Sequence, residues 1–276
     1  DVNGDGLDDV IIGAYGANPE GDLSGRTFVF FGREGSGHQQ MQTLVQGDGG
    51  FAINGEAADD YSGFAVGDGG DVNGDGFADV IVGAKGSDAK GLDAGRTYVV
   101  HGGDFSHALT HRGNQGPDSL SGSPADEVMV AGRGNDLLYS GGGADVLYGG
   151  EGDDELEILD DGFRRIDGGS GQDTLRIAAQ GVALDLTTIA DSRLTDIERL
   201  DLAGGGNTVI FELRDLRKMV GASRTLRILG EAGDAVEADL SGGNFVDLGE
   251  IDGFAVYDNG GLRLEIAAAV GMTVTL

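Results

Sequence analysis

Short apolar runs separated by glycine and aspartate fill the first hundred residues of the chain. Val10 to Ile12 and Val80 to Val82 are β-branched runs, and Phe28 to Phe31 and Tyr98 to Val100 are similarly short. Runs of this kind between turn residues predict strands of a small sheet. The remaining strands, which give about four per unit, are expected at Thr43 to Val45, Phe51 to Ile53 and Phe64 to Val66.

This strand pattern repeats when the chain is shifted by 70 residues. The segment DVNGDGLDDVIIGAYG (1–16) aligns with DVNGDGFADVIVGAKG (71–86) without a gap, and GRTFVFFG (25–32) aligns with GRTYVVHG (95–102). The sequence therefore predicts a duplicated structural unit.

A second repeat follows, in which an acidic residue stands at every ninth position from residue 118. A hydrophobic residue comes two positions after each acid, and small residues, mostly glycine, precede it in the same phase. After a slip of one residue, a sixth copy occupies 168–176 and carries Asp173. The acids, the hydrophobic residues and the glycines are Asp118, Glu127, Asp136, Asp145 and Asp154; Leu120, Met129, Leu138, Leu147 and Leu156; and Gly132, Gly134, Gly141, Gly143, Gly150 and Gly152.

The nine-residue period predicts a coil in which each copy forms half a turn of the coil. Six residues make a turn whose glycines adopt positive φ, and three make a short strand that points its leucine inward. Residues 18 positions apart then stack on the same side. This stacking predicts two columns of acids, one of Asp118, Asp136 and Asp154 and one of Glu127 and Asp145.

From about residue 177 the chain changes to mixed segments, most of which alternate as half-buried strands do. A short helix is expected at Leu213 to Val220, with Leu213, Leu216 and Val220 on one side and basic residues on the other. The predicted fold class is all-β with one short helix, divided into three parts at 1–112, 113–176 and 177–276.

The charge of the chain indicates a cationic partner. Formal net charge is −30, which disfavours nucleic acid and anionic membranes as partners. Cysteine is absent, so disulfides and thiolate zinc sites are excluded. No apolar run approaches the ~18 residues of a membrane span. The chain begins inside a motif without a signal peptide, so we expect the C-terminal piece of a longer protein.

The spacing D-x-N-x-D-G-x-x-D occurs twice in the duplicated unit. Side-chain oxygens at alternate positions of a tight loop converge on one point, and main-chain carbonyls can add further ligands. An all-oxygen set suits Ca²⁺ rather than Zn²⁺. A metal-free turn rich in Asp and Asn is the alternative. The candidate ligands are Asp1, Asn3, Asp5, Leu7 (carbonyl) and Asp9, and Asp71, Asn73, Asp75, Phe77 (carbonyl) and Asp79.

The stacked acids of the nonapeptide copies form the second candidate set, together with main-chain carbonyls of the turns at Gly132, Gly134, Gly141, Gly143, Gly150 and Gly152. Between neighbouring coils their carboxylates would repel one another without a cation and would become ligands with Ca²⁺. A disordered glycine-rich linker is the alternative, but it explains neither the leucines nor the phase. The copy at 123–130 departs from the pattern at Pro124, Ala125 and Glu127, which weakens the Glu127/Asp145 pair as a site.

Catalytic patterns are missing from the sequence. His107 and His111 stand four residues apart but have no carboxylate partner at zinc spacing, so a solvated pair is expected. No H-E-x-x-H, G-x-S-x-G or phosphate-loop pattern occurs. We expect that this chain is not an enzyme.

The segment GDVNGDGFADVIVGA (70–84), followed by GRTYVV, resembles FG-GAP repeats, the blades of the integrin α-subunit propeller. This resemblance implies that residues 1–112 form partial β-propeller blades with a Ca²⁺ loop between blade strands. It also implies that the Asp and Asn residues of both loops are metal ligands. Only one full unit and part of another are present, whereas a closed propeller needs ~4–8 blades.

Residues 113–176 resemble the RTX, or haemolysin-type, nonapeptide G-G-x-G-x-D-x-U-x, which implies a parallel β-roll that binds Ca²⁺. From Ile197 the chain is similar to the C-terminal region of bacterial proteins exported by type I secretion, many of them adhesins. The resemblance implies that the secretion machinery is a partner and that the protein is extracellular or on the cell surface. The C-terminal part is then a β-rich cap and secretion region.

Three functions remain open from the sequence. In the first, the roll folds on calcium after export and the blades bind an extracellular protein or glycan. In the second, the chain is the export module of a secreted hydrolase whose catalytic domain lies upstream. In the third, it is a calcium-stabilised structural segment without a ligand.

Overall fold

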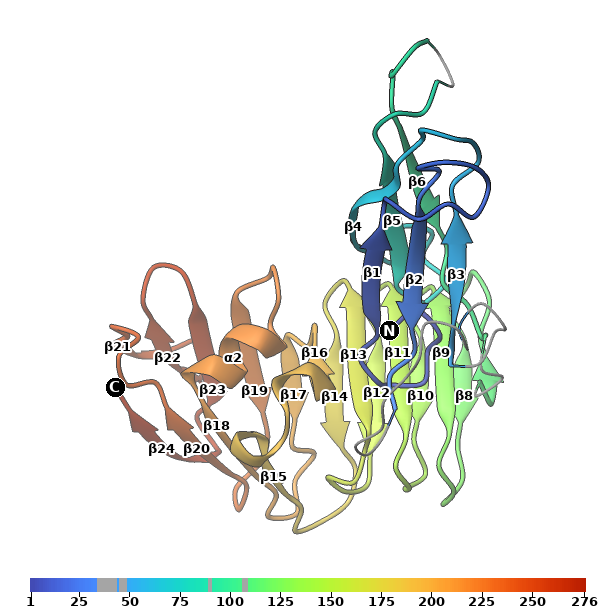
Figure 1. Ribbon diagram of the computed structural model, residues 1–276. Coiled ribbons are helices and arrows are strands. Elements are labelled where there is room, and N and C mark those ends of the chain that lie inside the picture. The colour runs from blue at the N-terminus through green and yellow to red at the C-terminus, as the bar shows by residue number, and fades with distance from the viewer. Residues whose placement is uncertain (34–43, 45–48, 89–90, 106–108) are drawn as a thin grey trace. The chain divides into compact units, whose positions relative to one another are not determined.

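A computed structural model describes residues 1–33, 44, 49–88, 91–105 and 109–276 (Figure 1). The chain divides into two compact units, Asp1–Ala108 (unit 1) and Leu109–Leu276 (unit 2). The regular secondary structure of both is almost wholly strand, as the sequence predicts. Neither of them has, among the described residues, a helix with the length and apolar character that crossing a bilayer requires.

Unit 1 contains two three-stranded antiparallel sheets. Their pairings repeat at the 70-residue offset, since Val10 pairs with Phe30 and Val80 pairs with Val100. The strand expected at Thr43 to Val45 lies outside the described residues except for Leu44, which is helical. The strands are β1 (Val10–Ala14), β2 (Arg26–Phe30), β3 (Gly50–Asn54), β4 (Ser62–Gly70), β5 (Asp79–Ala84) and β6 (Arg96–Val100).

Unit 2 contains parallel sheets through which the chain passes alternately, so that every second strand lies in the same sheet over residues 111–177. The first sheet contains β8 (Ser119–Ser121), β10 (Leu137–Tyr139), β12 (Glu155–Ile158), β14 (Thr174–Ile177), β17 (Arg199–Asp201), β19 (Thr225–Leu229), β23 (Arg263–Ala267) and, antiparallel at its edge, β22 (Phe254–Asp258) and β21 (Val246–Ile251). The second contains β7 (His111–Arg112), β9 (Val128–Arg133), β11 (Val146–Glu151), β13 (Arg165–Ser170) and β16 (Leu194–Thr195). The third contains β15 (Ala183–Asp185), β18 (Thr208–Glu212), β20 (Ala235–Asp239) and β24 (Gly271–Thr275).

The register of these sheets follows the nonapeptide period. Leu138 pairs with Leu120 on one side and with Leu156 on the other, each 18 residues away. The slip in the sequence appears as a 19-residue step from Leu156 to Leu175. Three of these leucines are fully buried and Leu120 packs against them, so the predicted inward row forms the core of unit 2.

The first sheet continues beyond the nonapeptide pattern. Leu175 pairs with Leu200, which in turn pairs with Ile228, and all three are buried. Residue 176 therefore marks the end of the glycine-rich repeats but not the end of a sheet. Alternating apolar residues are enough to extend the stack where the glycine turns are absent.

The predicted helix is present as α2 (Leu213–Met219), the single α-helix of unit 2. A capping box holds its start, where the Glu212 N–H donates to Asp215 Oδ2 at 2.8 Å. Leu216 and Val220 are buried, while Arg214 is exposed beside acidic residues. Two short 3₁₀ turns precede the helix, η1 (Leu186–Thr188) and η2 (Asp191–Arg193).

Candidate metal centres

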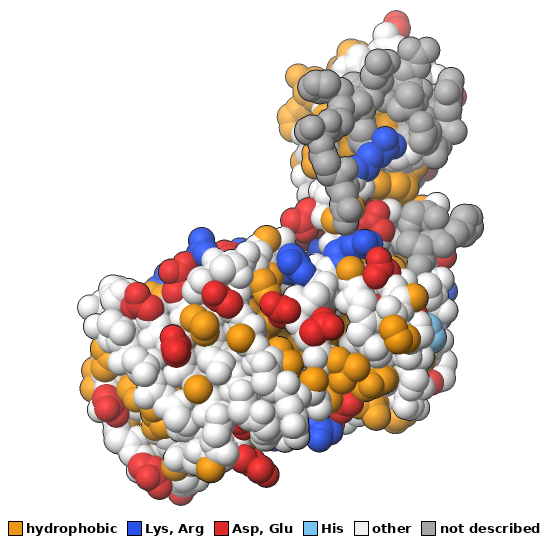
Figure 2. Space-filling model, turned by 90° about the horizontal axis from the view of Figure 1, so that it is seen from below, with side chains coloured by type: hydrophobic (Ala, Val, Ile, Leu, Met, Phe, Trp, Pro, Cys, Tyr) orange, Lys and Arg blue, Asp and Glu red, His pale blue; other side chains and the backbone are white. Residues whose placement is uncertain are grey.

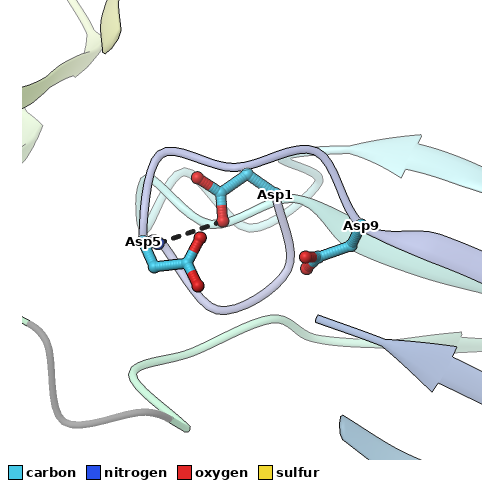
Figure 3. A group of neighbouring side chains, drawn as sticks. All are labelled: Asp1, Asp5 and Asp9. Atoms are coloured by element: carbon cyan, nitrogen blue, oxygen red, sulfur yellow. Dashed lines mark hydrogen bonds between the residues drawn. The ribbon is translucent and has the colours of Figure 1, made fainter. Parts of the chain in front are cut away.

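The first acidic loop of unit 1 gathers three carboxylates from nine consecutive residues. Carboxylate oxygens of Asp1, Asp5 and Asp9 lie within 4.8 Å of one another (Figure 3). Asp1 accepts the N–H groups of Gly4 and Gly6, each at 2.7 Å, and thereby curls the chain around its own side chain. The loop thus brings together the acids that its spacing predicts.

Asp9 closes the loop from the strand side. Its Oδ2 accepts the Val2 N–H at 2.7 Å, and its Oδ1 accepts the Gly32 N–H at 2.8 Å. Burial raises the pKa of Asp9 above its usual range. The carboxylate is therefore costly to keep charged in the folded loop unless a cation lies nearby.

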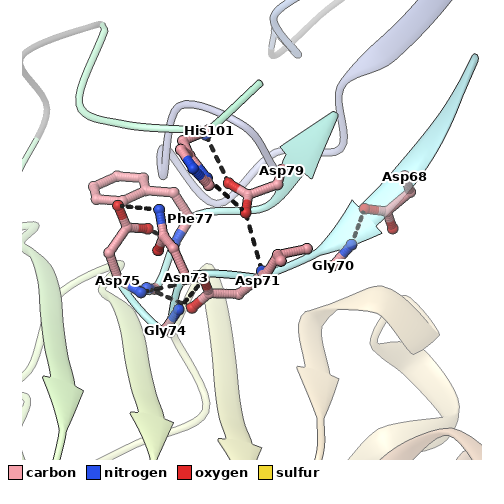
Figure 4. Close-up of polar contacts among 12 residues, drawn as sticks. Asp68, Gly70, Asp71, Asn73, Gly74, Asp75, Phe77, Asp79 and His101 are labelled. Carbon is pink, nitrogen blue, oxygen red and sulfur yellow. Dashed lines mark hydrogen bonds and ion pairs between the residues drawn. The ribbon is translucent and has the colours of Figure 1, made fainter. Parts of the chain in front are cut away.

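The second loop repeats these bonds 70 residues later (Figure 4). Asp71 accepts the N–H groups of Gly74 at 2.8 Å and Gly76 at 2.7 Å. Asp79 Oδ2 accepts the Val72 N–H at 3.0 Å and also lies 3.1 Å from Nδ1 of His101. His101 occupies the position of Phe31 in the other copy, so the two loops differ in one neighbour of the closing aspartate.

Asn3 and Asn73 take the same place in both loops. Each donates from Nδ2 to the aspartate two positions later, at 2.8 Å to Asp5 and at 3.1 Å to Asp75. The N–H groups of Leu7 and Phe77 donate to the same aspartates, which leaves their carbonyls as predicted ligands. The loops are therefore formed by their own hydrogen bonds as well as being rich in oxygen.

The acids of unit 2 form a ladder that runs from coil to coil. Each main-chain N–H donates to the carboxylate of the acid in the next coil, over 2.7 Å from Asp118 to Asp136 and 2.8 Å from Asp136 to Asp154. Asp154 donates in the same way to Asp173 at 2.8 Å. The column that the nine-residue spacing predicts is thus present, and the sixth copy joins it.

Three of the ladder carboxylates have one oxygen without a protein partner. Oδ2 of Asp136, Asp154 and Asp173 is buried and accepts no hydrogen bond from the described residues. The three side chains belong to residues that are at most 3% exposed. A buried anionic oxygen without a partner is strongly unfavourable, so this column requires either protons or cations.

The pKa values of the buried acids also show that their charge is unfavourable. Burial, with added repulsion from neighbouring acids, raises the pKa of Asp154 to about 7 and that of Asp173 to about 8. Burial also raises the pKa of Asp145 to about 6, with Glu127 as the nearest acid. These carboxylates are not fully ionised at neutral pH until a cation compensates their charge.

Stacked glycines bring the turns close enough for such sites. Gly150 and Gly152 have φ of +111° and +142°, and a Cβ on either would overlap the carbonyl oxygen of Gly132 or Gly134 below it. Side chains are excluded here, and main-chain carbonyls line the space between coils. These oxygens are of the type that Ca²⁺ prefers.

A small residue also stands five positions before each acid. A Cβ on Gly149 would overlap Oδ2 of Asp154 and would lie 2.5 Å from the carbonyl oxygen of Gly168 in the next coil. The carboxylate therefore folds over its own copy and faces a carbonyl of the neighbouring one. This spacing is a further signal in the sequence, which the predicted pattern of acids, leucines and glycines does not include; the six positions are Gly113, Gly122, Ala131, Ser140, Gly149 and Gly168.

The second column is shorter than the first. The Glu127 N–H donates to Asp145 Oδ1 at 2.9 Å, which brings the predicted pair together. Glu127 itself is held by the N–H and hydroxyl of Ser123, and in the next coil Arg164 stands opposite Asp145 where an acid would be needed. The irregular copy thus gives a ladder of two acids that cannot continue.

Two groups extend the ladder pattern beyond the repeats. The Asp173 N–H donates to Glu198 Oε2 at 2.9 Å. In the third sheet, the Val182 N–H donates to Asn207 Oδ1 at 2.8 Å, and the Asn207 N–H donates to Asp234 Oδ1 at 2.9 Å. Neither extension was predicted from the sequence, although Glu198 precedes Leu200 by two positions as the other acids precede their leucines.

The histidine pair is only partly described. His107 lies outside the described residues. His111 lies on β7, is half-buried, and has Nδ1 3.0 Å from the hydroxyl of Thr110. No contact of His111 among the described residues indicates a metal site.

Two protein families match parts of the chain. Residues 112–136 and 121–156 match the RTX calcium-binding nonapeptide repeat (4 copies), and residues 64–100 match the FG-GAP repeat. No curated protein and no solved structure matches the chain. The chain therefore carries RTX calcium-binding nonapeptide repeats followed by a β-rich C-terminal region, and an FG-GAP repeat before them.

These matches confirm the repeat types and the cofactor that the sequence predicts. RTX nonapeptide repeats bind calcium, so the protein is a calcium-binding protein of the RTX type. Such repeats are typical of secreted proteins. The donors fit the ion, because carboxylate oxygens without protein partners face a space lined by main-chain carbonyls.

Proposed function

We propose that unit 2 is a calcium-triggered folding module of a secreted protein. The observation that carries this proposal is the column of Asp136, Asp154 and Asp173, each with one buried carboxylate oxygen that no described group satisfies. Calcium supplied to this column removes the cost of burying the charges.

The expected energies are large enough to control folding. Extracellular calcium modules bind with Kd of roughly 10⁻⁴–10⁻³ M. At tenfold above Kd, each site adds about 1.4 kcal/mol to the free energy of unfolding. Several sites in one column therefore move the stability by an amount comparable to that of a small domain.

Calcium dependence would keep the module unfolded before export and fold it afterwards. In a compartment with low calcium the acids repel one another and the coil stays unfolded, a state suited to passage through a type I exporter. Outside the cell, millimolar calcium folds it. The protein is accordingly proposed to act outside the cell or at its surface, with the secretion machinery as a partner.

Unit 1 is proposed to act in binding rather than in catalysis. An open groove with a volume of about 410 Å³ runs beside Phe64, Lys85 and Arg96. Nζ of Lys85 lies 4.0 Å from the ring centre of Phe64 and makes no ion pair with the described residues. An aromatic ring with an uncompensated cation favours a ligand that carries both an apolar face and an acidic group, such as an acidic glycan or peptide.

Calcium titration of the full chain tests the folding module. Far-ultraviolet circular dichroism should show a gain of β structure between chelator and millimolar Ca²⁺, and little gain with the same concentration of Mg²⁺. Equal spectra in chelator and in Ca²⁺ would exclude the proposal. Size-exclusion chromatography of the same samples should show compaction only with Ca²⁺.

A further inference from the structure

The acidic ladder does not end where the nonapeptide repeats end. The Asp173 N–H donates to Oε2 of Glu198 at 2.9 Å, as every earlier acid of the column donates to the acid of the next coil. Glu198 follows Asp173 by 25 residues, whereas the earlier steps are 18 or 19 residues. A residue far outside the repeat pattern thus occupies the next ladder position.

Asp196 supplies the matching main-chain oxygen. The pairing of β13 with β16 sets Asp167 opposite Thr195, and Asp196 is therefore next to Gly168. A Cβ on Gly168 would overlap the carbonyl oxygen of Asp196 and would lie 2.9 Å from Cγ of Asp173. In the preceding coil, Gly149 meets the carbonyl oxygen of Gly168 and the carboxylate of Asp154 in the same way.

The last turn is shorter, and the type of acid changes with it. Four residues, 169–172, connect Gly168 with Asp173, but only Ile197 lies between Asp196 and Glu198. Glutamate carries one methylene more than aspartate, and its carboxylate reaches the N–H of Asp173 from this shorter turn. The length of the side chain accounts for a glutamate where the repeats have aspartate.

The carboxylate of Asp173 has an oxygen without a protein partner at this position. Asp173 is 0% exposed, and its Oδ2 is buried without a hydrogen-bond partner among the described residues. We propose that Asp173, Glu198 and the main-chain carbonyl of Asp196 form a further calcium site, to which the last repeat supplies one ligand and residues beyond the repeats supply the other two. This inference rests on the proposed calcium-dependent folding of unit 2.

A calcium ion at this site would make the folding of the C-terminal region depend on calcium. Arg199 begins β17 directly after Glu198, and β17 pairs with β14 of the repeats on one side and with β19 on the other. An ion held by Asp173 and Glu198 therefore joins the last repeat to the strands that follow. Ordering of β17 and β19 becomes calcium-dependent although neither strand carries a repeat.

The variant Glu198→Gln of the full chain tests the site. Its amide oxygen still accepts the Asp173 N–H, while the negative charge is lost. Equilibrium dialysis with ⁴⁵Ca²⁺ should count one bound ion fewer per chain. Hydrogen exchange should show that half-protection of β17 and β19 needs about tenfold more calcium, while β10 and β12 keep the wild-type midpoint.

Glu237→Gln is the matched control, because Glu237 is exposed on β20 and lies outside the ladder. If Glu198→Gln binds as many ions as this control, with the same midpoint for β17, the site is excluded. A wild-type chain without calcium-dependent protection in any strand would instead overturn the proposed folding module.

A second variant covers the case in which Glu198→Gln does not fold at millimolar calcium. Glu198→Asp keeps the charge on a shorter side chain. Recovery of its folding at higher calcium would support the site. Failure to recover at any calcium concentration would indicate a structural hydrogen bond only and would overturn the inference.

Discussion

The loops of unit 1 and the column of unit 2 gather acids in two different ways. Asp1, Asp5 and Asp9 come from one stretch of nine residues, and main-chain N–H groups of the same unit satisfy them. Asp136 and Asp154 come from different coils, and each keeps a buried oxygen without a partner. The loop therefore has main-chain donors for its carboxylates before a cation binds, whereas the ionised column is favourable only with a cation.

The surface of unit 2 does not reveal this difference. On the face of the larger body that Figure 2 shows, acidic side chains are scattered among apolar and uncharged ones. The acids of the column are instead buried between the coils. The acids behind the net charge of −30 thus fall into two groups. Those at the surface are solvated by water, whereas those buried in the column have their charge compensated by calcium.

Removal of calcium should give the largest difference in hydrogen-exchange protection between the two units. In excess chelator, β10, β11 and β12 should lose their hydrogen-exchange protection by several orders of magnitude, because the repelling carboxylates unfold the coil. The strands β1, β2, β5 and β6 should lose less than about tenfold. Mass spectrometry of peptic fragments measures both, and equal loss in the two units would contradict the comparison.

The pH dependence without calcium should be the second largest effect. Folding raises the pKa of Asp154 to about 7 and that of Asp173 to about 8 through burial, so the native state binds more protons than the unfolded state between pH 4 and 8. Stability in chelator is therefore greatest in acid and falls as pH rises through this range.

Urea unfolding in chelator at pH 5 and pH 8 measures this dependence. In saturating calcium the slope should reverse, because protons then compete with the ion for the same carboxylates. A roll that becomes more stable with rising pH in chelator would show that the acids are not buried as described.

A glycine substitution should distinguish a crowded coil from an open turn. Gly150→Ala places a Cβ against the carbonyl of Gly132 at a φ of +111°, which should cost about 3 kcal/mol from strain and overlap together. Gly70→Ala in unit 1 is the control, since Gly70 has a φ of +64° with open space around it. Its cost should stay near 1 kcal/mol.

Both costs are measured by urea unfolding in saturating calcium, with unit-specific hydrogen exchange to assign each transition. If the two variants lose equal stability, close contact between the coils is not what requires glycine at residue 150.

A pair of aspartate variants gives the smallest and sharpest test. Asp154→Asn removes a ligand and should lower stability by about 1.4 kcal/mol at calcium tenfold above Kd. In chelator at pH 8 the same variant should be more stable than the wild type, because a buried neutral amide replaces a buried carboxylate. Asp5→Asn lies in the loop whose carboxylates accept main-chain N–H groups. Its effect on stability should not change sign between calcium and chelator.

Thermal unfolding in calcium and in chelator reports all four values. A loss of stability for Asp154→Asn in both conditions would mean that its charge is compensated without an ion.

Much of the fold could be predicted because its periods are regular. The 70-residue and nine-residue repeats place the strands, the inward leucines and the first column of acids. Glu198 and the pair of Asn207 and Asp234 could not be placed in this way. The step of 25 residues from Asp173 to Glu198 includes β15, and the step of 27 residues from Asn207 to Asp234 includes β18. No fixed period encodes the length of these connections.

The hydrogen bonds of the ladder all point in one direction along the chain. In every step from Asp118 to Glu198, the later coil supplies the acceptor and the earlier coil supplies the donor. A copy removed from the start of the array would leave a buried carboxylate oxygen without its donor, whereas a copy removed from its end would leave a main-chain N–H without its acceptor. The two ends of the stack are therefore chemically different: the first must be closed by a hydrogen-bond donor and the last by an acceptor, which Glu198 supplies here.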